Sequence, residues 1–290
     1  MQGRIIKIIS NQYTVLTEEN QFVLCVAMGK VRLQMQPVVG DFVEIEKLEG
    51  QTGIQKVLPR INQMNRPLIA NVDQALIVMS AVEPEFSAQL VDRLIFLVCH
   101  SQIRPILVVT KMDLVKDKSL ILEQIEDYRR SGYLTILSSE HQIESEEKQL
   151  RKILLDKVTV LTGQSGVGKS SLLNRLNPDF QIRTQGISKA LGRGKHTTRH
   201  SELLPVAGGW VADTPGFSSL DFNHMSLEDL RAAIRDFAPF QKECRFRDCS
   251  HFDEPDCAVK AALQAGKLSS NRYNHYKEVA YLIKTRKEKY

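Results

Sequence analysis

The chain has 290 residues, of which 42% are hydrophobic and 7% aromatic, so it is long enough for two or three domains with a sizeable core. Basic residues outnumber acidic ones by 39 to 34, a formal net charge of +5. No apolar run approaches the length of a membrane span, and residues 1–10 lack a signal-peptide core. We therefore expect a cytoplasmic protein.

Residues 1 to about 65 carry short runs in which apolar and polar residues alternate. The clearest runs are 4–8, 13–16, 21–26 and 39–46. About five strands in this length predict a small β-barrel. From the residues alone, a barrel without a ligand is the simpler interpretation.

A buried parallel strand is predicted at 106–110, and the apolar run ends in a T-K-x-D sequence. That sequence consists of Thr110, Lys111, Met112 and Asp113. A carboxylate at this strand end can accept hydrogen bonds from guanine N1–H and its 2-amino group, whereas adenine offers neither donor. Leaving such a group unmatched discriminates strongly between bases. Ser138 and Ser139 follow the next apolar run, 134–137, and their backbone N–H groups are candidates for contact with guanine O6.

A glycine-rich loop of the form G-x-x-x-x-G-K-S follows a third predicted strand at 157–161 and precedes a helical pattern. This strand–loop–helix context is typical of phosphate binding, because the glycines let successive backbone N–H groups point at the phosphates. Lys169 is expected to reach the β- and γ-phosphates, and Ser170 to hold Mg²⁺. An ordinary glycine-rich turn is the alternative. The predicted nucleotide-binding residues of the loop are Gly163, Gln164, Ser165, Gly166, Val167, Gly168, Lys169, Ser170 and Ser171.

Two further segments complete the predicted nucleotide site. Asp213 opens a D-T-P-G sequence after a short strand, where its carboxylate is suited to Mg²⁺ and the Gly216 N–H to the γ-phosphate. A simple tight turn is the alternative. The interval between the two motifs holds G-R-G-K-H-T-T-R at 192–199, and Thr198 or Thr197 is the candidate switch threonine for Mg²⁺.

The residue after D-T-P-G is Phe217, where a common GTPase places a glutamine that orients the attacking water. Slow intrinsic hydrolysis is therefore predicted. His196 is the internal candidate for the water-positioning catalytic residue, because an imidazole can polarise water. The alternative is a surface or RNA-contacting histidine.

Three of the five cysteines lie close together, with a histidine between them. The spacing C-x₄-C-x-H-x₅-C supplies the ligands of a tetrahedral Zn²⁺. A closed shell of three thiolates and one imidazole predicts one structural zinc ion, with no open position for a catalytic water. The predicted ligands are Cys244, Cys249, His251 and Cys257. Cys25 and Cys99 lie in apolar runs and are predicted to be core residues.

The last predicted helix is basic, because residues 267–290 contain seven lysines and arginines and two acids. Its apolar stripe is Tyr276, Val279, Ala280 and Ile283. A solvated face is the ordinary interpretation of such charge. A helix that contacts RNA phosphates is the functional one.

The order of the motifs is unusual, because the base-reading elements precede the phosphate loop and D-T-P-G follows it. A circular permutation explains this order. Together with the G-R-G-K-H-T-T-R string, it resembles the circularly permuted bacterial GTPases of the ribosome small-subunit-dependent GTPase A family, over essentially the whole chain. Two departures stand out. Thr110 replaces a common asparagine, so a weaker guanine N7 contact and a weaker tie to the phosphate loop are expected, and Ser139 replaces the usual alanine.

The resemblance implies a multidomain protein: an OB-fold β-barrel at 1–65, an α/β circularly permuted P-loop GTPase domain at 66–222 and a mainly helical zinc-binding domain at 223–290. It implies a GTP hydrolase that acts as a nucleotide-dependent switch in late maturation of the 30S ribosomal subunit. Such an enzyme is slow alone and is activated by the subunit. The implied partners are GTP and GDP with Mg²⁺, the 30S subunit and 16S rRNA, with no membrane, and a monomer is expected. A P-loop NTPase of other base preference, or an RNA-binding switch with a non-ribosomal partner, remains the alternative.

Overall fold

A computed structural model describes most of the chain. The described residues are 1–29, 31, 35–48, 50–65, 67–139, 143–177, 202–213 and 220–286. They form two compact units. Restricted to these residues, one unit spans 1–29, 31, 35–48, 50–65, 67–74, 144–161, 169–177 and 202–213, and the other spans 75–139, 143, 162–168 and 220–286.

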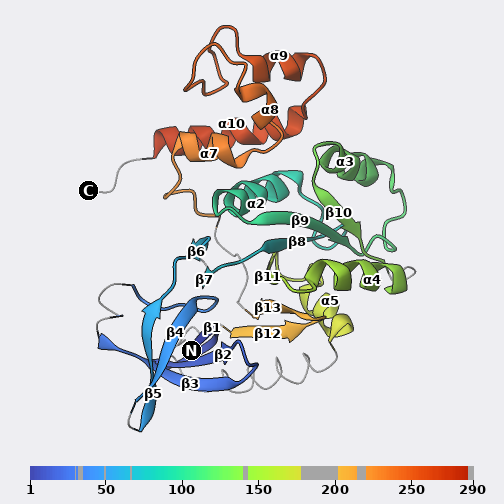
Figure 1. The fold of residues 1–290 in the computed structure, drawn as a ribbon. Coiled ribbons are helices and arrows are strands. Elements are labelled where there is room, and N and C mark those ends of the chain that lie inside the picture. Colours follow the sequence, from blue (N-terminus) through green and yellow to red (C-terminus); the bar gives the residue numbers. More distant parts are fainter. Residues whose placement is uncertain are drawn as a thin grey trace. The chain divides into compact units, whose positions relative to one another are not determined.

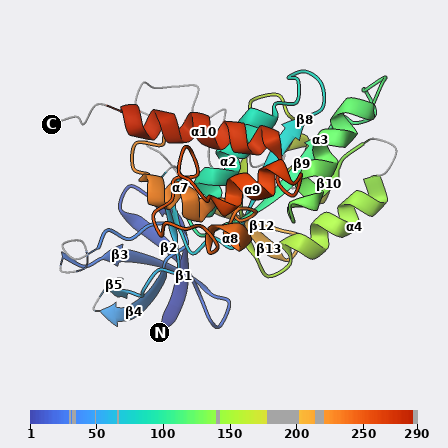
Figure 2. The same cartoon turned by 90° about the horizontal axis from the view of Figure 1, so that it is seen from above.

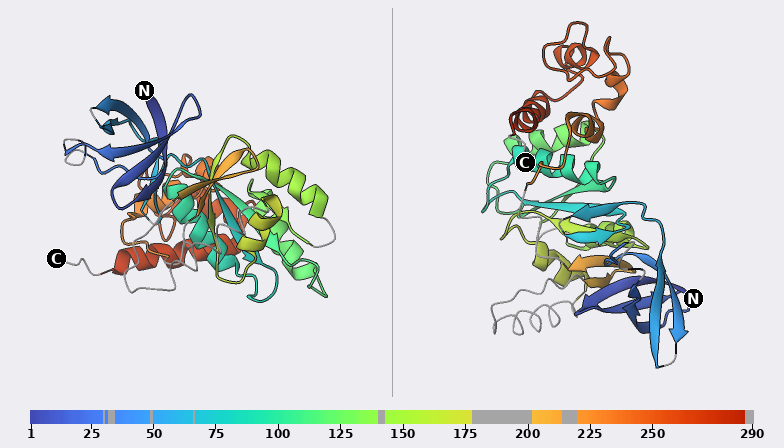
Figure 3. Two further views of the ribbon diagram at one scale, coloured as in Figure 1. Left: turned by 90° about the horizontal axis from the view of Figure 1, so that it is seen from below. Right: turned by 90° about the vertical axis from the view of Figure 1, so that its left-hand side faces the viewer.

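The first unit begins with the predicted barrel, which is confirmed as a closed β-barrel (Figures 1 and 3). Its strands neighbour one another in the order β1-β2-β3-β5-β4, and an antiparallel pairing of β4 with β1 closes it. Inward side chains such as Ile5, Val15, Val43 and Ile54 are fully buried, which explains the alternating pattern. The strands are β1 (Gln2–Ile9), β2 (Gln12–Thr17), β3 (Phe22–Ala27), β4 (Phe42–Leu48) and β5 (Gln51–Val57).

The rest of the first unit is α/β. Strand β11 runs parallel to β13, β12 is antiparallel to β13, and β1 of the barrel pairs with β12 through Lys7 and Glu202. The ammonium of Lys7 lies 2.9 Å from the Glu202 carboxylate, so an ion pair accompanies that pairing. These elements are β6 (Gln63–Asn65), β7 (Leu68–Ala70), α4 (Ile143–Leu154), β11 (Val158–Thr162), α5 (Lys169–Leu176), β12 (Glu202–Val206) and β13 (Gly209–Asp213).

In the second unit, three strands lie in the order β10-β9-β8, with β9 and β10 parallel. Strand β8 is buried throughout, and all but the first residue of β9 is buried, as expected for strands covered on both faces. The elements are β8 (Gln74–Ser80), α2 (Ala88–His100), β9 (Arg104–Thr110), α3 (Ser119–Arg130) and β10 (Leu134–Leu137).

The C-terminal part of this unit is helical, and α7 and α10 pack against α2 (Figure 2). The predicted stripe of α10 is confirmed, because Tyr276, Val279, Ala280 and Ile283 are all buried. The helices are α7 (Leu227–Ala233), α8 (Ala238–Gln241), α9 (Ala258–Gln264) and α10 (Ser270–Thr285). Among the described helices, none combines the length and apolar character that crossing a bilayer requires.

Candidate nucleotide-binding site and metal centre

The phosphate-loop candidate forms a tight turn between β11 and α5. Three of its glycines, Gly163, Gly166 and Gly168, have φ values of +135°, +81° and +92°, which side-chain-bearing residues rarely adopt. A Cβ on Gly163 would lie 2.0 Å from the carbonyl oxygen of Val78 in β8, so only glycine fits there. Gln164, Ser165 and Gly166 are exposed, whereas Val167 is fully buried and anchors the loop.

Thr110 ties this loop to the end of β9. Its hydroxyl lies 2.7 Å from the Val167 carbonyl oxygen and 3.2 Å from that of Met79. A hydroxyl has one proton, so the shorter contact marks Val167 as the main acceptor. Threonine is short, but the Val167 backbone comes close enough for this hydrogen bond. How its strength compares with the tie that an asparagine would make stays a prediction.

The two base-reading segments lie at the same edge of the sheet, because β9 and β10 are parallel and both end there. The Ser138 N–H donates to the Val109 carbonyl at 2.7 Å, and the Met112 N–H donates to the Ser138 carbonyl at 3.2 Å. Asp113 and Ser139 are half-buried. Lys111 has a φ of +57° and its ammonium donates to the Glu83 carbonyl. The structure thus brings Thr110, the 163–168 loop and Ser138 together.

Helix α5 begins at Lys169, directly after the loop, as the motif predicts. Burial lowers the pKa of Lys169, because a partly desolvated ammonium is less stable than a hydrated one. Phosphate oxygens are the natural counter-charge for a cation in this position. Ser170 and Ser171 are exposed in the first turn of the helix.

The switch residues are described only in part. Asp213 is the last residue of β13, and its backbone is paired with Glu202 of β12. His196, Thr197, Thr198, Gly216 and Phe217 lie outside the described residues, so their roles stay predictions.

The four predicted zinc ligands converge in the C-terminal part of the second unit. Their ligand atoms all lie within 4.8 Å of one another. The Cys244 Sγ lies 4.0 Å from the Cys257 Sγ and 3.7 Å from the His251 Nδ1, and the Cys257 Sγ lies 3.4 Å from that Nδ1. Around a tetrahedral Zn²⁺, sulfur atoms are roughly 3.8 Å apart and sulfur and nitrogen roughly 3.5 Å apart. The residues therefore fit a structural zinc ion.

The electrostatics of this cluster also suit a cation. Burial raises the pKa of Cys249 to about 12 and also raises that of Cys257, while burial lowers the pKa of His251 to about 4. The imidazole is thus held in the neutral form that binds metal. The thiolates need a nearby positive charge, which a zinc ion provides. Cys25 is buried as predicted, whereas Cys99 is half-buried.

Aromatic residues of α10 contact the segment that carries the four predicted zinc ligands, residues 244–257, which we call the metal loop. The sequence pattern did not reveal this role. The Tyr273 hydroxyl donates to the His251 carbonyl and the Tyr276 hydroxyl donates to the Ser250 carbonyl, each at 2.6 Å. The Glu254 carboxylate accepts from the backbone N–H groups of Ser250 and Phe252. The loop backbone is therefore fixed from two sides.

Arg272 is one of the cations counted in the basic C-terminal helix, but it does not lie on the exposed face of α10. Its side chain is 1% exposed and paired inside the unit, so it is not available to a phosphate. A signal was present in the sequence. Arg272 precedes Tyr276 by four residues and Val279 by seven, which places it on the buried stripe.

Comparison with known proteins supports one family over the whole chain. The model of the RsgA GTPase family matches residues 55–223, and that of the RsgA N-terminal domain matches residues 2–54. Proteins named small ribosomal subunit biogenesis GTPase RsgA are similar along 100% of this chain and 99% of their own length. The one from Geobacillus sp. strain WCH70 is 47% identical, and the one from Bacillus subtilis strain 168 is 44% identical.

Two solved structures share the fold. One is described as the crystal structure of YloQ, a circularly permuted GTPase; it is 40% identical with a TM-score of 0.84, and the match covers 100% of this chain and 96% of that one. YjeQ from Thermotoga maritima is 35% identical with a TM-score of 0.83, and the match covers 99% of each chain. The fold is thus a circularly permuted GTPase with an N-terminal barrel and a C-terminal Cys/His cluster, and the chain belongs to the RsgA GTPase family.

Proposed function

We propose that this protein hydrolyses GTP as a nucleotide-dependent switch in late maturation of the small ribosomal subunit. The observation that carries the proposal is the Thr110 hydroxyl bonded to the Val167 carbonyl, since it joins the phosphate loop to the T-K-M-D segment. Family membership supports the same activity. Neither the phosphate loop nor the T-K-M-D segment alone is specific for guanine nucleotides. A phosphate-binding loop next to a base-reading segment is the arrangement that supports guanine nucleotide binding.

The residues divide into three roles. The backbone of the 163–168 loop and the Lys169 ammonium are proposed to bind the phosphates. Asp113 is proposed to select guanine. The residues proposed to surround the base are Thr110, Lys111, Met112, Ser138 and Ser139. Ser170, Asp213 and Thr198 are proposed to hold Mg²⁺, which neutralises phosphate charge when bound with GTP. Gly216 is proposed to sense the γ-phosphate.

Hydrolysis is proposed to be slow until the small ribosomal subunit binds. Phe217 stands where a water-orienting glutamine is common, so another group must place the water. His196 is our candidate, with a group supplied by the subunit as the alternative. Because the γ-phosphate would order both the 192–199 loop and Gly216, we expect the GTP form to bind the subunit better.

We further propose a three-domain division, 1–65, 66–222 and 223–290, in a monomer that contacts 16S rRNA. The family models meet at residues 54 and 55, which supports a boundary near the end of the barrel. The barrel and the exposed cations of α10, such as Lys277 and Lys284, are the proposed RNA contacts. Arg272 is excluded from them by its burial.

We expect the Asp113→Asn protein to lose affinity for GTP on the order of 100-fold, because an amide cannot accept both guanine donors. It should gain affinity for xanthosine triphosphate, whose 2-oxo group accepts a hydrogen bond from the amide. Competition binding against a fluorescent guanine nucleotide measures both effects.

Asp117→Asn is the matched control, since Asp117 lies four residues further along and its carboxylate accepts hydrogen bonds from the Ser119 N–H and hydroxyl. It should bind GTP like the parent protein. Equal affinity of the parent for GTP and ATP would contradict guanine selectivity and favour a P-loop NTPase of another base preference.

A further inference from the structure

Arg272 of α10 is a fully buried cation with several partners. Its Nε lies 3.1 Å from Asp92 Oδ1, and its Nη1 lies 2.6 Å from both Asp236 Oδ2 and Ser131 Oγ. A third carboxylate, that of Asp127, lies 3.9 Å from Nη2. Burial alone would lower the pKa of Arg272, but the nearby carboxylates outweigh it and raise that pKa, so the guanidinium stays charged.

Most partners of Arg272 belong to the part of the chain that carries the base-reading loops, whereas Asp236 lies in the turn after α7. Asp92 belongs to α2, Asp127 to α3 and Ser131 to the turn that follows α3. The guanidinium carbon also lies 4.7 Å from the Tyr128 ring centre and 5.2 Å from that of Tyr133. All of these except Asp92 and Asp236 lie between Asp113 and Ser138 along the chain, so Arg272 contacts the segment that joins the two base-reading loops.

The same helix contacts the metal loop through the next residues. Tyr273 and Tyr276 donate to the carbonyls of His251 and Ser250, as described above, and the rings of both pack near Phe237. His275, on the Arg272 side, lies 2.6 Å from Asp92 Oδ2. Within α10, Tyr273 therefore bonds to the backbone of the zinc ligand His251, and the preceding residue, Arg272, contacts α2 and α3.

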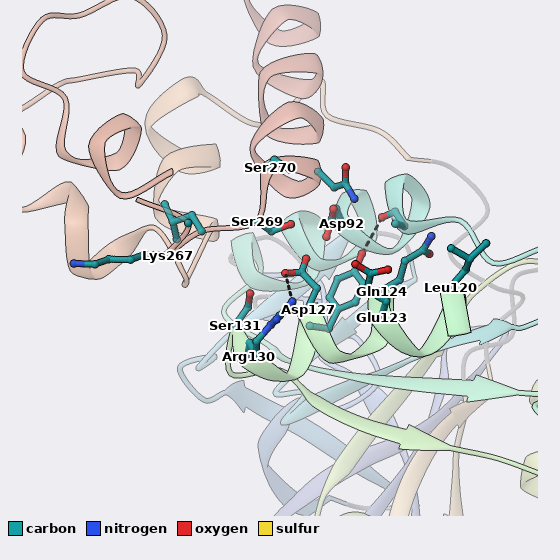
Figure 4. Close-up of a pocket in the computed structure, with 15 residues that line it drawn as sticks. Asp92, Leu120, Glu123, Gln124, Asp127, Arg130, Ser131, Lys267, Ser269 and Ser270 are labelled. Atoms are coloured by element: carbon teal, nitrogen blue, oxygen red, sulfur yellow. Dashed lines mark hydrogen bonds and ion pairs between the residues drawn. The ribbon is translucent and has the colours of Figure 1, made fainter. Parts of the chain in front are cut away.

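The packing between α2, α3 and the start of α10 leaves a cavity. A cavity of about 480 Å³ lies between α2, α3 and the residues that lead into α10. Figure 4 shows Asp92, Asp127 and Ser131 at its wall, and all three contact Arg272. Asp127 and Ser131, at the wall of this cavity, thus connect α3 and the turn after it to Arg272 of α10.

We propose that Arg272 is a positioning residue that couples the zinc site to the base-reading loops. With zinc bound, the metal loop fixes α10, and Arg272 then holds α3 and the turn before β10. Without zinc, the loop backbone loosens, α10 shifts or frays, and the segment between Asp113 and Ser138 loses its anchor. Coupling of this kind is a free energy between two sites and acts in both directions.

Hydrogen exchange of the full chain tests the coupling without any nucleotide. In the native protein, removing the metal with a chelator should speed exchange of residues 119–137 by roughly tenfold, within the range usual for coupled sites. Exchange of the barrel strands, residues 2–57, should stay unchanged. If residues 244–264 become fast while 119–137 keep their zinc-loaded rates, the proposal is wrong.

Arg272→Lys provides the second measurement, because it keeps the charge that the carboxylates need but lacks the planar fork. With zinc bound, residues 119–137 of this variant should exchange several-fold faster than those of the native protein. Removing the metal should then raise their exchange rate by less than about twofold. The matched control is the reverse exchange at an exposed lysine of α4 outside every proposed site, Lys148→Arg, which should behave like the native protein. A native response to chelation in Arg272→Lys would overturn the role of Arg272.

The consequence for nucleotide binding rests on the proposed function. Removing zinc should weaken GDP binding several-fold in the native protein and much less in Arg272→Lys, whose loops are already loosened. GDP affinity that is equal with and without zinc in the native protein would overturn the link to the base-reading loops. If the zinc-loaded native protein binds no GDP, the proposed function fails, and the exchange measurements still decide the coupling of zinc to 119–137.

Discussion

The Gly163→Ala protein will bind GTP at least about 100-fold more weakly than the parent, because its phosphate loop cannot keep its shape. The φ of +135° at Gly163 is strained for any residue with a Cβ, and that Cβ would meet the Val78 backbone oxygen at 2.0 Å. The backbone of the buried strand β8 cannot move away cheaply. We also expect the free energy of unfolding to fall by about 2–5 kcal/mol, from backbone strain and overpacking together.

A second glycine provides the control for this prediction. Gly50 has a φ of +81°, and a Cβ there would meet nothing within 4 Å. Gly50→Ala should therefore cost only about 1–2 kcal/mol of stability and leave GTP affinity unchanged. Nucleotide titration and urea unfolding measure both proteins. Native GTP affinity in Gly163→Ala would show that the loop does not bind phosphate in the conformation described.

The Cys257→Ser protein will lose its zinc, from about one ion per chain to almost none, because a serine hydroxyl does not replace a thiolate ligand. The stability of the C-terminal helices should fall by at least about 3 kcal/mol, a part of the roughly 10–16 kcal/mol that structural zinc contributes in zinc-finger peptides. Aromatic packing around Phe237 and Tyr276 limits the loss, since it remains without the ion. Metal analysis and thermal unfolding provide the two readouts.

Cys99→Ser is the corresponding control, because Cys99 is a half-buried thiol in α2, outside the cluster. It should keep its full zinc content. A Cys257→Ser protein that retains both metal and stability would exclude the four-ligand zinc site.

Much of the fold could be predicted from the sequence wherever the pattern of apolar residues matches the side chains that the structure buries. The alternating runs of residues 1–65 gave the barrel, and the apolar run before Thr110 gave a buried strand. The Cys/His spacing predicted a cluster that the fold does bring together. In each case, residues that are close together in the sequence carry the pattern, although pairing between distant segments completes the barrel.

What the sequence did not reveal depends on contacts between distant segments. The charge count of residues 267–290 included Arg272 among the cations of a basic helix, but carboxylates from α2 and from the turn after α7 surround it. The hydrogen bond from Thr110 to Val167 was not readable in the sequence, because side-chain length says nothing about how close the loop backbone comes. Close backbone approach and the partners of a buried charge are tertiary properties, which composition and periodicity do not specify.

GTP turnover with and without purified small ribosomal subunits tests the central claim most directly. At low salt, subunits should accelerate turnover by two or more orders of magnitude, as trans-acting partners do for other GTPases. Raising the salt concentration should weaken the effect steeply, because phosphate contacts dominate such binding. If subunits accelerate turnover and His196→Ala is also accelerated normally, the subunit supplies the group that orients the water. If subunits neither bind the protein nor accelerate turnover at low salt, the ribosomal role is contradicted.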